Sequence, residues 1–395
     1  MISRKSKKQT REHFPTKDSI DRSDSKRPSA VFVVAHPDDS LLFQSPSLLS
    51  QIQRGGDTLT VHLNAGDHGL GADYWRNRER GIEVAYARMA NRSATWESTS
   101  LRIGNQSVVL KTLVDQPSVK LVFMRLPDGG FPLGLGSRRY GFQSLSKLLD
   151  GTIKTIDTVD HDSTFDRAEL ISGVSSLFES TSPDLIAALD YSDRHDGQEH
   201  PDHYASAAIA YEAHLKASFP HIFVGFSGYS CSHFEANVDP NLLDIKTAIF
   251  NSYSEYDSQV PFVKRDDDES WYSKWLCREY TLGVEANRLM AIARYEQVVR
   301  PGALVRLDGH LSAGPSHQAL TFHWRQTLGI AVTLDDPHSA NPSFVAPLDE
   351  SRTEFELVVS DEATSSTPSF VGVSINKDLR DNMTMGWDES GRGTD

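Results

Sequence analysis

The stretch Val31-Phe-Val-Val-Ala-His-Pro-Asp-Asp39 places an imidazole and two carboxylates directly after an apolar segment. Four consecutive apolar residues, three of them valine, predict a buried parallel strand. Such strands deliver side chains to the crevice beyond their carboxyl ends, and Pro37 ends this strand and fixes the turn. His36 and Asp39 can then converge on a cation such as zinc, which leaves Asp38 free to handle protons. A second interpretation is that the aspartates cap the helix that follows.

A second cluster, Asp190-Tyr-Ser-Asp-Arg-His-Asp-Gly-Gln-Glu-His200-Pro-Asp-His203, follows an apolar run at 185–189 that predicts another buried strand. Pro201 favours a helix start there. Because His200 and His203 are three residues apart, both imidazoles would lie on one side of the first helical turn. One of them can bind a metal while the other faces whatever the metal binds. A lone pair of this kind is usually a surface or capping pair, but two such clusters after strands favour a metal site.

Together, Ala35-His-Pro-Asp-Asp39 and His200-Pro-Asp-His203 resemble the paired motifs of the PIG-L/LmbE family of zinc-dependent de-N-acetylases, which remove acetyl or related acyl groups from amino sugars. The resemblance extends from about residue 30 to about residue 300. It passes through Asn64-Ala-Gly-Asp-His-Gly69, Arg78-Glu79 and Leu126-Pro-Asp-Gly129. At one position the chain departs from the family, which usually has glutamate after the two aspartates where this chain has Ser40.

The resemblance implies one zinc ion per chain, held by His36, Asp39 and His203, although other divalent metals can bind such ligands. It also implies that Asp38 is the general base and that His200 stabilises the oxyanion. These roles agree with the chemistry, because amide hydrolysis at neutral pH needs a strong nucleophile. Zinc supplies one by lowering the pKa of bound water to about 7.

Three further residues have two interpretations each. Asp202 lies between the two histidines and either orients one of them or serves as a helix N-terminal carboxylate. Asp128 resembles a family position that binds sugar hydroxyls, but Pro-Asp-Gly-Gly is also a turn sequence. Arg78 resembles a substrate-side arginine of the family, although Arg76 or Arg80 could take that place.

The chain has 395 residues, enough for about two domains. Residues 1–29 are polar and predict a disordered or loosely attached extension. Apolar runs that predict strands lie at 31–34, 59–63, 121–126, 185–189 and 222–226, and helical periodicity lies at 76–90, 203–217 and 282–299. The alternation predicts an α/β domain over 30–299, with a mostly parallel sheet of the Rossmann-like LmbE architecture. A hairpin or an insertion is expected between residues 91 and 121.

After Arg300-Pro-Gly302 the sequence changes to short alternating runs, which are typical of a β-sandwich. Predicted strands lie at 303–307, 320–324, 332–334, 343–345, 354–359 and 370–375. The sequence around Trp324 and at 355–361 resembles the immunoglobulin-like PKD type of module, with Trp324 either in its core or serving as a sugar platform. We expect this module over 300–378 and a flexible tail over 379–395.

The net charge of −14 argues against nucleic acid or an anionic membrane as the main partner. No apolar run is long enough for a transmembrane helix, and no apolar signal core is visible, so the localisation stays open. Cys231 and Cys277 are the only cysteines and form neither a disulfide framework nor a zinc motif. The aromatic pair at 74–75 could stack on a sugar or cover the start of a helix.

The sequence therefore predicts a zinc-dependent hydrolase that removes an N-acetyl group from an N-acetylglucosamine-type sugar or glycoconjugate. One alternative is an amidase that acts on a sugar conjugate or an acylated antibiotic. Another, motivated by Ser40 and the added sandwich, is a carbohydrate-binding protein with a vestigial hydrolase site.

Overall fold

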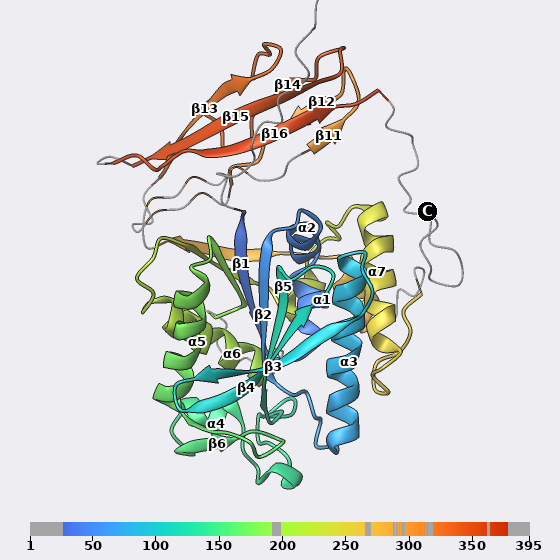
Figure 1. Cartoon of the computed structure of the whole chain (residues 1–395), viewed down its shortest axis with the longest axis vertical. Helices are drawn as coiled ribbons and strands as arrows, with labels where there is room; N and C mark the ends of the chain where they lie inside the picture. The colour runs from blue at the N-terminus through green and yellow to red at the C-terminus, as the bar shows by residue number, and fades with distance from the viewer. Residues whose placement is uncertain are drawn as a thin grey trace, which may run out of the picture.

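The computed structural model describes residues 27–377, apart from 192–198, 265–269, 287–288, 290, 292, 294–296, 311, 313, 315–318 and 362–363. The predicted N-terminal extension up to residue 26 and the predicted tail over 379–395 lie outside the described residues. An eight-stranded sheet with helices on both faces forms the larger unit, and smaller C-terminal sheets lie beyond one end of it (Figure 1).

The large sheet is parallel in its centre and antiparallel at its edges. Its strands, in spatial order, are β10 (Thr281–Ala286), β9 (Ile222–Phe226), β8 (Leu185–Leu189), β1 (Ser29–Val34), β2 (Asp57–Asn64), β5 (Val119–Leu126), β4 (Gln106–Leu113) and β3 (Trp96–Ile103). The strands from β9 to β5 run parallel, whereas β10, β4 and β3 pair antiparallel. The chain moves outward from β1 to β2 and β5 on one side, and to β8 and β9 on the other. The strand order thus reverses at β1, and ligands bind at such switch points, beyond the carboxyl ends of the strands.

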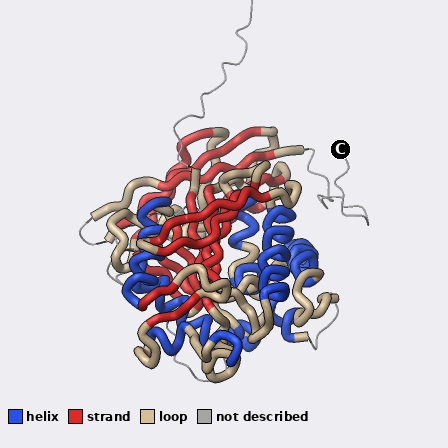
Figure 2. The backbone as a smooth tube through the Cα atoms, turned by 60° about the horizontal axis from the view of Figure 1, so that its bottom comes forward, coloured by secondary structure: helices blue, strands red, loops and turns tan. Residues whose placement is uncertain are grey.

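Helices cover both faces of this sheet, as the tube in Figure 2 shows. They are α1 (Asp39–Phe43), α2 (Ser47–Gln53), α3 (Ala72–Met89), α4 (Leu145–Leu149), α5 (Arg167–Thr181), α6 (Pro201–His214), α7 (Pro240–Ser254) and α8 (Trp271–Leu276), with short 3₁₀ turns η1 (Arg138–Tyr140) and η2 (Tyr229–His233). Helices α3 and α7 pack against each other on one face, and α5 and α6 pack on the other (Figure 1). A small hairpin of β6 (Thr155–Asp157) and β7 (Thr164–Asp166) precedes α5. The central strands are therefore buried on both faces, as their apolar sequences predict.

The predicted α/β fold is confirmed, including a hairpin, β3 and β4, in the segment between 91 and 121. The predicted helix over 282–299 is wrong, because strands β10 and β11 occupy its two ends. The segment has helical spacing of apolar residues, but β10 instead pairs with the backbone groups that β9 would otherwise expose at the sheet edge. The predicted strand over 332–334 is also wrong, since that stretch is irregular.

The C-terminal unit is a β-sandwich. Its strands are β11 (Gln297–Val299), β12 (Leu304–Arg306), β13 (Thr321–Leu328), β14 (Ser343–Val345), β15 (Ser351–Ser360) and β16 (Ser369–Ile375). A four-stranded sheet in the order β11-β16-β15-β13 and the β12-β14 pair share one apolar core. Trp324 is buried in this core and its indole Nε1 donates to the carbonyl of Ser339 at 3.1 Å, so the core interpretation of Trp324 is confirmed.

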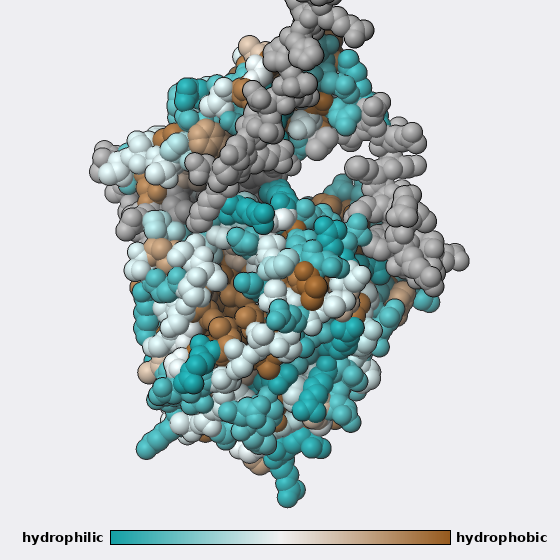
Figure 3. All heavy atoms as spheres, in the orientation of Figure 1, coloured by the Kyte–Doolittle hydropathy of each residue, from teal (hydrophilic) through white to brown (hydrophobic). Residues whose placement is uncertain are grey.

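The visible surface of the α/β unit is mainly hydrophilic, with apolar residues gathered in small patches (Figure 3). In the part of the chain that the structure describes, no helix has both the length and the apolar character needed to cross a membrane.

We expect the α/β unit to fold without the sandwich, because none of the residues that the structure describes belongs to both apolar cores. The partly buried Leu289 already packs on the sandwich core, so the natural place to end a truncated chain is just after Ala286, where β10 ends. A chain of residues 1–286 should stay soluble, unfold cooperatively and keep the metal content of the full protein, as measured by circular dichroism and elemental analysis. Aggregation or loss of metal would show instead that the sandwich completes the α/β core.

Candidate metal centre

All the residues that the sequence predicts for the site meet at the carboxyl edge of the parallel strands. Those predicted residues are His36, Asp38 and Asp39 after β1, Arg78 on α3, Asp128 after β5, and His200, Asp202 and His203 at the start of α6. The site lies where the strand order reverses, because β1 and β8 are neighbours whose following segments carry the histidines. Their side chains are buried.

Three donor atoms converge in a geometry that suits a metal ion. His36 Nδ1 lies 3.3 Å from His203 Nε2, and Asp39 places Oδ1 at 3.0 Å from His203 Nε2 and Oδ2 at 3.5 Å from His36 Nδ1. Tetrahedral ligands bound at 2.0–2.1 Å are separated from one another by about 3.3 Å. The spacing of these donor atoms therefore fits a small cation such as zinc.

Hydrogen bonds on the outer side of each imidazole fix the nitrogen that faces inward. His203 Nδ1 lies 2.7 Å from Glu199 Oε1, and since an ionised carboxylate only accepts, Nδ1 carries the proton of the neutral ring and Nε2 then presents a lone pair. His36 Nε2 lies 3.3 Å from Asp202 Oδ2, which leaves the lone pair of His36 on Nδ1. Two lone pairs and the Asp39 carboxylate thus face one another in a buried space, an arrangement that requires a positive charge between them.

The pKa directions agree with that requirement. Burial lowers the pKa of His203, but Asp39 and hydrogen bonds to Asp39 and Glu199 raise it to about 9. Burial likewise lowers the pKa of His36, but Asp39 and Asp202 raise it well above its usual range. Burial raises the pKa of Asp39, yet the two histidines bring it well below its usual range. The electrostatics of the pocket therefore favour a cation beside Asp39, which a divalent metal supplies.

The adjacent aspartates have different partners. Asp39 contacts both histidines, whereas Asp38 Oδ1 accepts a hydrogen bond from Arg78 Nη2 at 2.6 Å. Asp38 stands at the N-cap of α1, but its side chain makes no capping hydrogen bond, so the capping interpretation has no support in the structure. Burial raises the pKa of Asp38 and Arg78 lowers it, with a net rise that makes this carboxylate a better proton acceptor.

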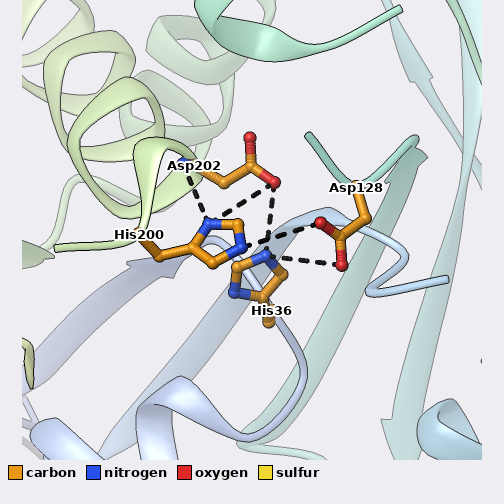
Figure 4. A group of neighbouring side chains, drawn as sticks. All are labelled: His36, Asp128, His200 and Asp202. Atoms are coloured by element: carbon orange, nitrogen blue, oxygen red, sulfur yellow. Dashed lines mark hydrogen bonds and ion pairs between the residues drawn. The ribbon is translucent and has the colours of Figure 1, made fainter. Parts of the chain in front are cut away.

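A second group of four side chains shares His36 with the first and consists of His36, Asp128, His200 and Asp202 (Figure 4). The Asp202 amide donates to His200 Nδ1 at 3.1 Å, so the proton of the neutral ring is on Nε2, which faces Asp128 Oδ1 at 3.8 Å. Burial and the neighbouring His36 hold the pKa of His200 well below its usual range. His200 is thus a neutral N–H donor in this group.

Sequence reasoning did not single out Glu199, which orients His203, or the role of Asn64. Asn64 Nδ2 donates to Asp202 Oδ2 at 3.3 Å and to the Pro127 carbonyl at 2.8 Å. The spacing of Glu199 and His203, four residues apart, is the one signal that could have indicated their contact.

Aromatic rings surround the histidines. The edge of the Tyr229 ring meets His203 at 4.9 Å between centroids, and the half-exposed Phe131 stacks on His200 at 6.0 Å. The predicted pair at 74–75 does not offer two sugar-stacking faces, because Trp75 is fully buried.

Ser40, which stands where the family usually has glutamate, lies outside the set of metal donors. Ser40 is fully buried and accepts a hydrogen bond from the Tyr86 hydroxyl at 2.9 Å. Tyr86 lies on α3 and also reaches Thr60 on β2, so Ser40 ties α1 to the sheet and leaves the histidines and aspartates in place.

Residues 31–214 match the family model described as PIG-L: GlcNAc-PI de-N-acetylase. Among solved structures, the chain is similar to a deacetylase triple mutant of the teicoplanin biosynthetic pathway, with 12% identity over 63% of this chain and 88% of that one and a TM-score of 0.37. It is also similar to the N,N'-diacetylchitobiose deacetylase of Pyrococcus horikoshii, with 14% identity, coverage of 60% and 72%, and a TM-score of 0.34.

The PKD domain of the KIAA 1837 protein is 27% identical over 22% of this chain and 83% of that domain, with a TM-score of 0.19. No curated protein sequence matches the chain. The segment that matches the PIG-L family model holds every predicted site residue from His36 to His203.

Proposed function

We propose that the protein is a zinc-dependent hydrolase that removes the N-acetyl group from an N-acetylglucosamine-type sugar or glycoconjugate. The observation that carries the proposal is that three metal-donor side chains and a separate carboxylate, which can act as a base, lie together in one buried site. His36 Nδ1, His203 Nε2 and Asp39 form a donor set of three, and the neighbouring Asp38 is kept out of it by Arg78. The description of the matched family as a de-N-acetylase supports the same reaction.

His36, Asp39 and His203 are the residues that would hold the zinc. Bound there, zinc would lower the pKa of a water molecule to about 7 and polarise the acyl carbonyl. Three protein ligands leave a coordination position open, which is the pattern of catalytic rather than structural zinc. Asp202 and Glu199 support the two imidazoles from behind and keep their lone pairs directed inward.

Two residues handle protons in the proposed reaction. Asp38 accepts the proton of the attacking water, because it is a buried carboxylate whose pKa is raised. His200, neutral and protonated on Nε2, donates a hydrogen bond to the oxygen that develops negative charge. Asp38, which then holds the proton taken from the water, returns it to the leaving amine.

Asp128 is the proposed contact for the sugar. Burial raises its pKa, but His36 and His200 lower it to about 2, so that Asp128 is an ionised acceptor at neutral pH. Its Oδ1 accepts the amide of Gly130 at 2.7 Å, which orients the carboxylate at the edge of the site. An ionised carboxylate can accept hydrogen bonds from vicinal sugar hydroxyls.

Both alternatives can be distinguished by their products. An amidase would release a larger acyl group, and a vestigial site would bind sugar without turnover. The vestigial alternative is less favoured, because Ser40 makes a hydrogen bond to Tyr86 and the donor set stays complete.

The proposal predicts acetate release from N-acetylated amino sugars, to be measured with an enzyme-coupled acetate assay over a panel of sugars and glycosides. Asp38→Asn keeps the size of the side chain and removes the proton acceptor, so kcat should fall by about 10²- to 10⁴-fold while the zinc content is kept. Release of only larger acyl groups, or binding without release, would replace the proposal with one of the alternatives.

The proposal also predicts about one zinc per chain on elemental analysis. His36→Ala, His203→Ala and Asp39→Asn each remove a donor and should lose most of the metal. His200→Ala should retain it, because His200 is a hydrogen-bond donor rather than a ligand. Equal metal loss in His200→Ala and His203→Ala would contradict these roles.

A further inference from the structure

Arg78, predicted as a sugar contact, is turned toward the proposed base. Its Nη2 donates to Asp38 Oδ1 at 2.6 Å, its Nη1 donates to the Gly66 carbonyl at 2.7 Å, and its Nε donates to the Tyr253 hydroxyl at 2.7 Å. The side chain is buried, and each of its three nitrogens has a partner inside the protein. The guanidinium group is therefore held in one orientation by the fold.

Behind Arg78 lies a second buried carboxylate, that of Asp257. Its Oδ2 is 2.8 Å from Arg78 Nε and accepts the Tyr253 hydroxyl at 2.6 Å. Its Oδ1 accepts the Tyr74 hydroxyl at 2.8 Å and the Gln259 amide at 3.0 Å. Asp257 is thus fixed on both oxygens, and one arginine is shared between Asp257 and Asp38.

Close packing of α3 and α7 brings these groups together. Gly81 lies one turn after Arg78 on α3, and a Cβ there would come within 2.8 Å of the Tyr253 ring and 2.9 Å of the Tyr253 carbonyl. Only glycine lets α7 approach this closely. Tyr253 and Asp257 lie beyond residue 214 and so outside the segment that matches the family model.

We propose that Asp257 is a positioning residue for Asp38, acting through Arg78. This inference rests on the proposed function. Asp257 pairs with the Nε side of the guanidinium group and offsets part of its positive charge. The Nη2 side therefore stays directed at Asp38 and holds the Asp38 carboxylate in a single orientation beside the metal centre. Because Asp257 is buried behind Arg78, its effect should fall on the catalytic step rather than on substrate binding.

Asp257→Asn is the direct test, since it keeps the shape of the side chain and removes its charge. With an N-acetylated sugar as substrate, kcat should fall about tenfold or more, while KM changes less than about twofold and the zinc content is unchanged. Tyr74→Phe removes one hydrogen bond to Asp257 and should give a smaller fall in kcat of about two- to fivefold.

The matched control is Asp160→Asn. Asp160 Oδ2 lies 2.8 Å from Arg125 Nη1, so this variant also removes a carboxylate from a largely buried arginine pair, but Arg125 contacts Glu79 and Asp160 rather than Asp38. Its kcat should stay at the wild-type value. An equal fall in kcat in Asp160→Asn would show a general effect of stability and would overturn the positioning role.

Two other results would overturn the inference: an unchanged kcat in Asp257→Asn, or a raised KM with kcat kept, which would make Arg78 a sugar contact. Should Asp257→Asn fail to fold, the same criteria apply to Tyr74→Phe. A wild-type protein without acetate release would contradict the proposed function alone. The positioning role is then tested by crystal structures of wild type and Asp257→Asn, in which the Arg78–Asp38 contact should be present and lost, respectively; its persistence in the variant would overturn the inference.

Discussion

The structure depends on one electrostatic constraint at the carboxyl edge of the sheet, where two imidazole lone pairs and a carboxylate face one another in a buried space. Such an arrangement is unfavourable without a positive charge, since buried lone pairs and a carboxylate repel one another. The His36 amide donates to Asp39 Oδ2 at 2.6 Å but leaves the carboxylate charged. The hydrogen bonds of Glu199 and Asp202 create this situation, because they place the protons of His203 and His36 on the outer nitrogens. A divalent cation satisfies all three donors at once.

The same constraint explains why two adjacent aspartates differ. Asp38 and Asp39 follow the same strand, and both would be drawn toward a cation. Arg78 supplies a competing positive charge on the side of α3, so that Asp38 pairs with the arginine and Asp39 stays with the histidines. The different partners of Asp38 and Asp39 are therefore a property of the packing of α3 and α7 against the sheet, and not of the motif alone.

How much of the fold and of the site could be predicted depends on how far apart in the sequence the interacting residues lie. The central strands were predictable, as was the gathering of the eight predicted residues at one place, because apolar runs mark buried parallel strands and their carboxyl ends share one edge. The edge strand β10 was not predictable, since its apolar residues have the spacing of a helix. Its conformation is decided by pairing with the backbone of β9, which would otherwise be exposed at the sheet edge.

Contacts between residues far apart in the sequence could not be predicted either. Nothing near Arg78 in the sequence indicates Asp257, which comes from the segment after α7 and meets Arg78 only through the packing that Gly81 permits. The role of Ser40 could also not be predicted, because it depends on the Tyr86 hydroxyl from α3.

We infer that a metal ion lies between His36, Asp39 and His203. An anomalous difference map from a crystal of the purified protein, recorded on both sides of the zinc absorption edge, tests it most directly. This donor set predicts one strong peak at about 2.0–2.2 Å from His36 Nδ1, His203 Nε2 and an Asp39 oxygen. A peak bound by Asp128 and His200 instead, or no peak in crystals grown with added zinc, would contradict it.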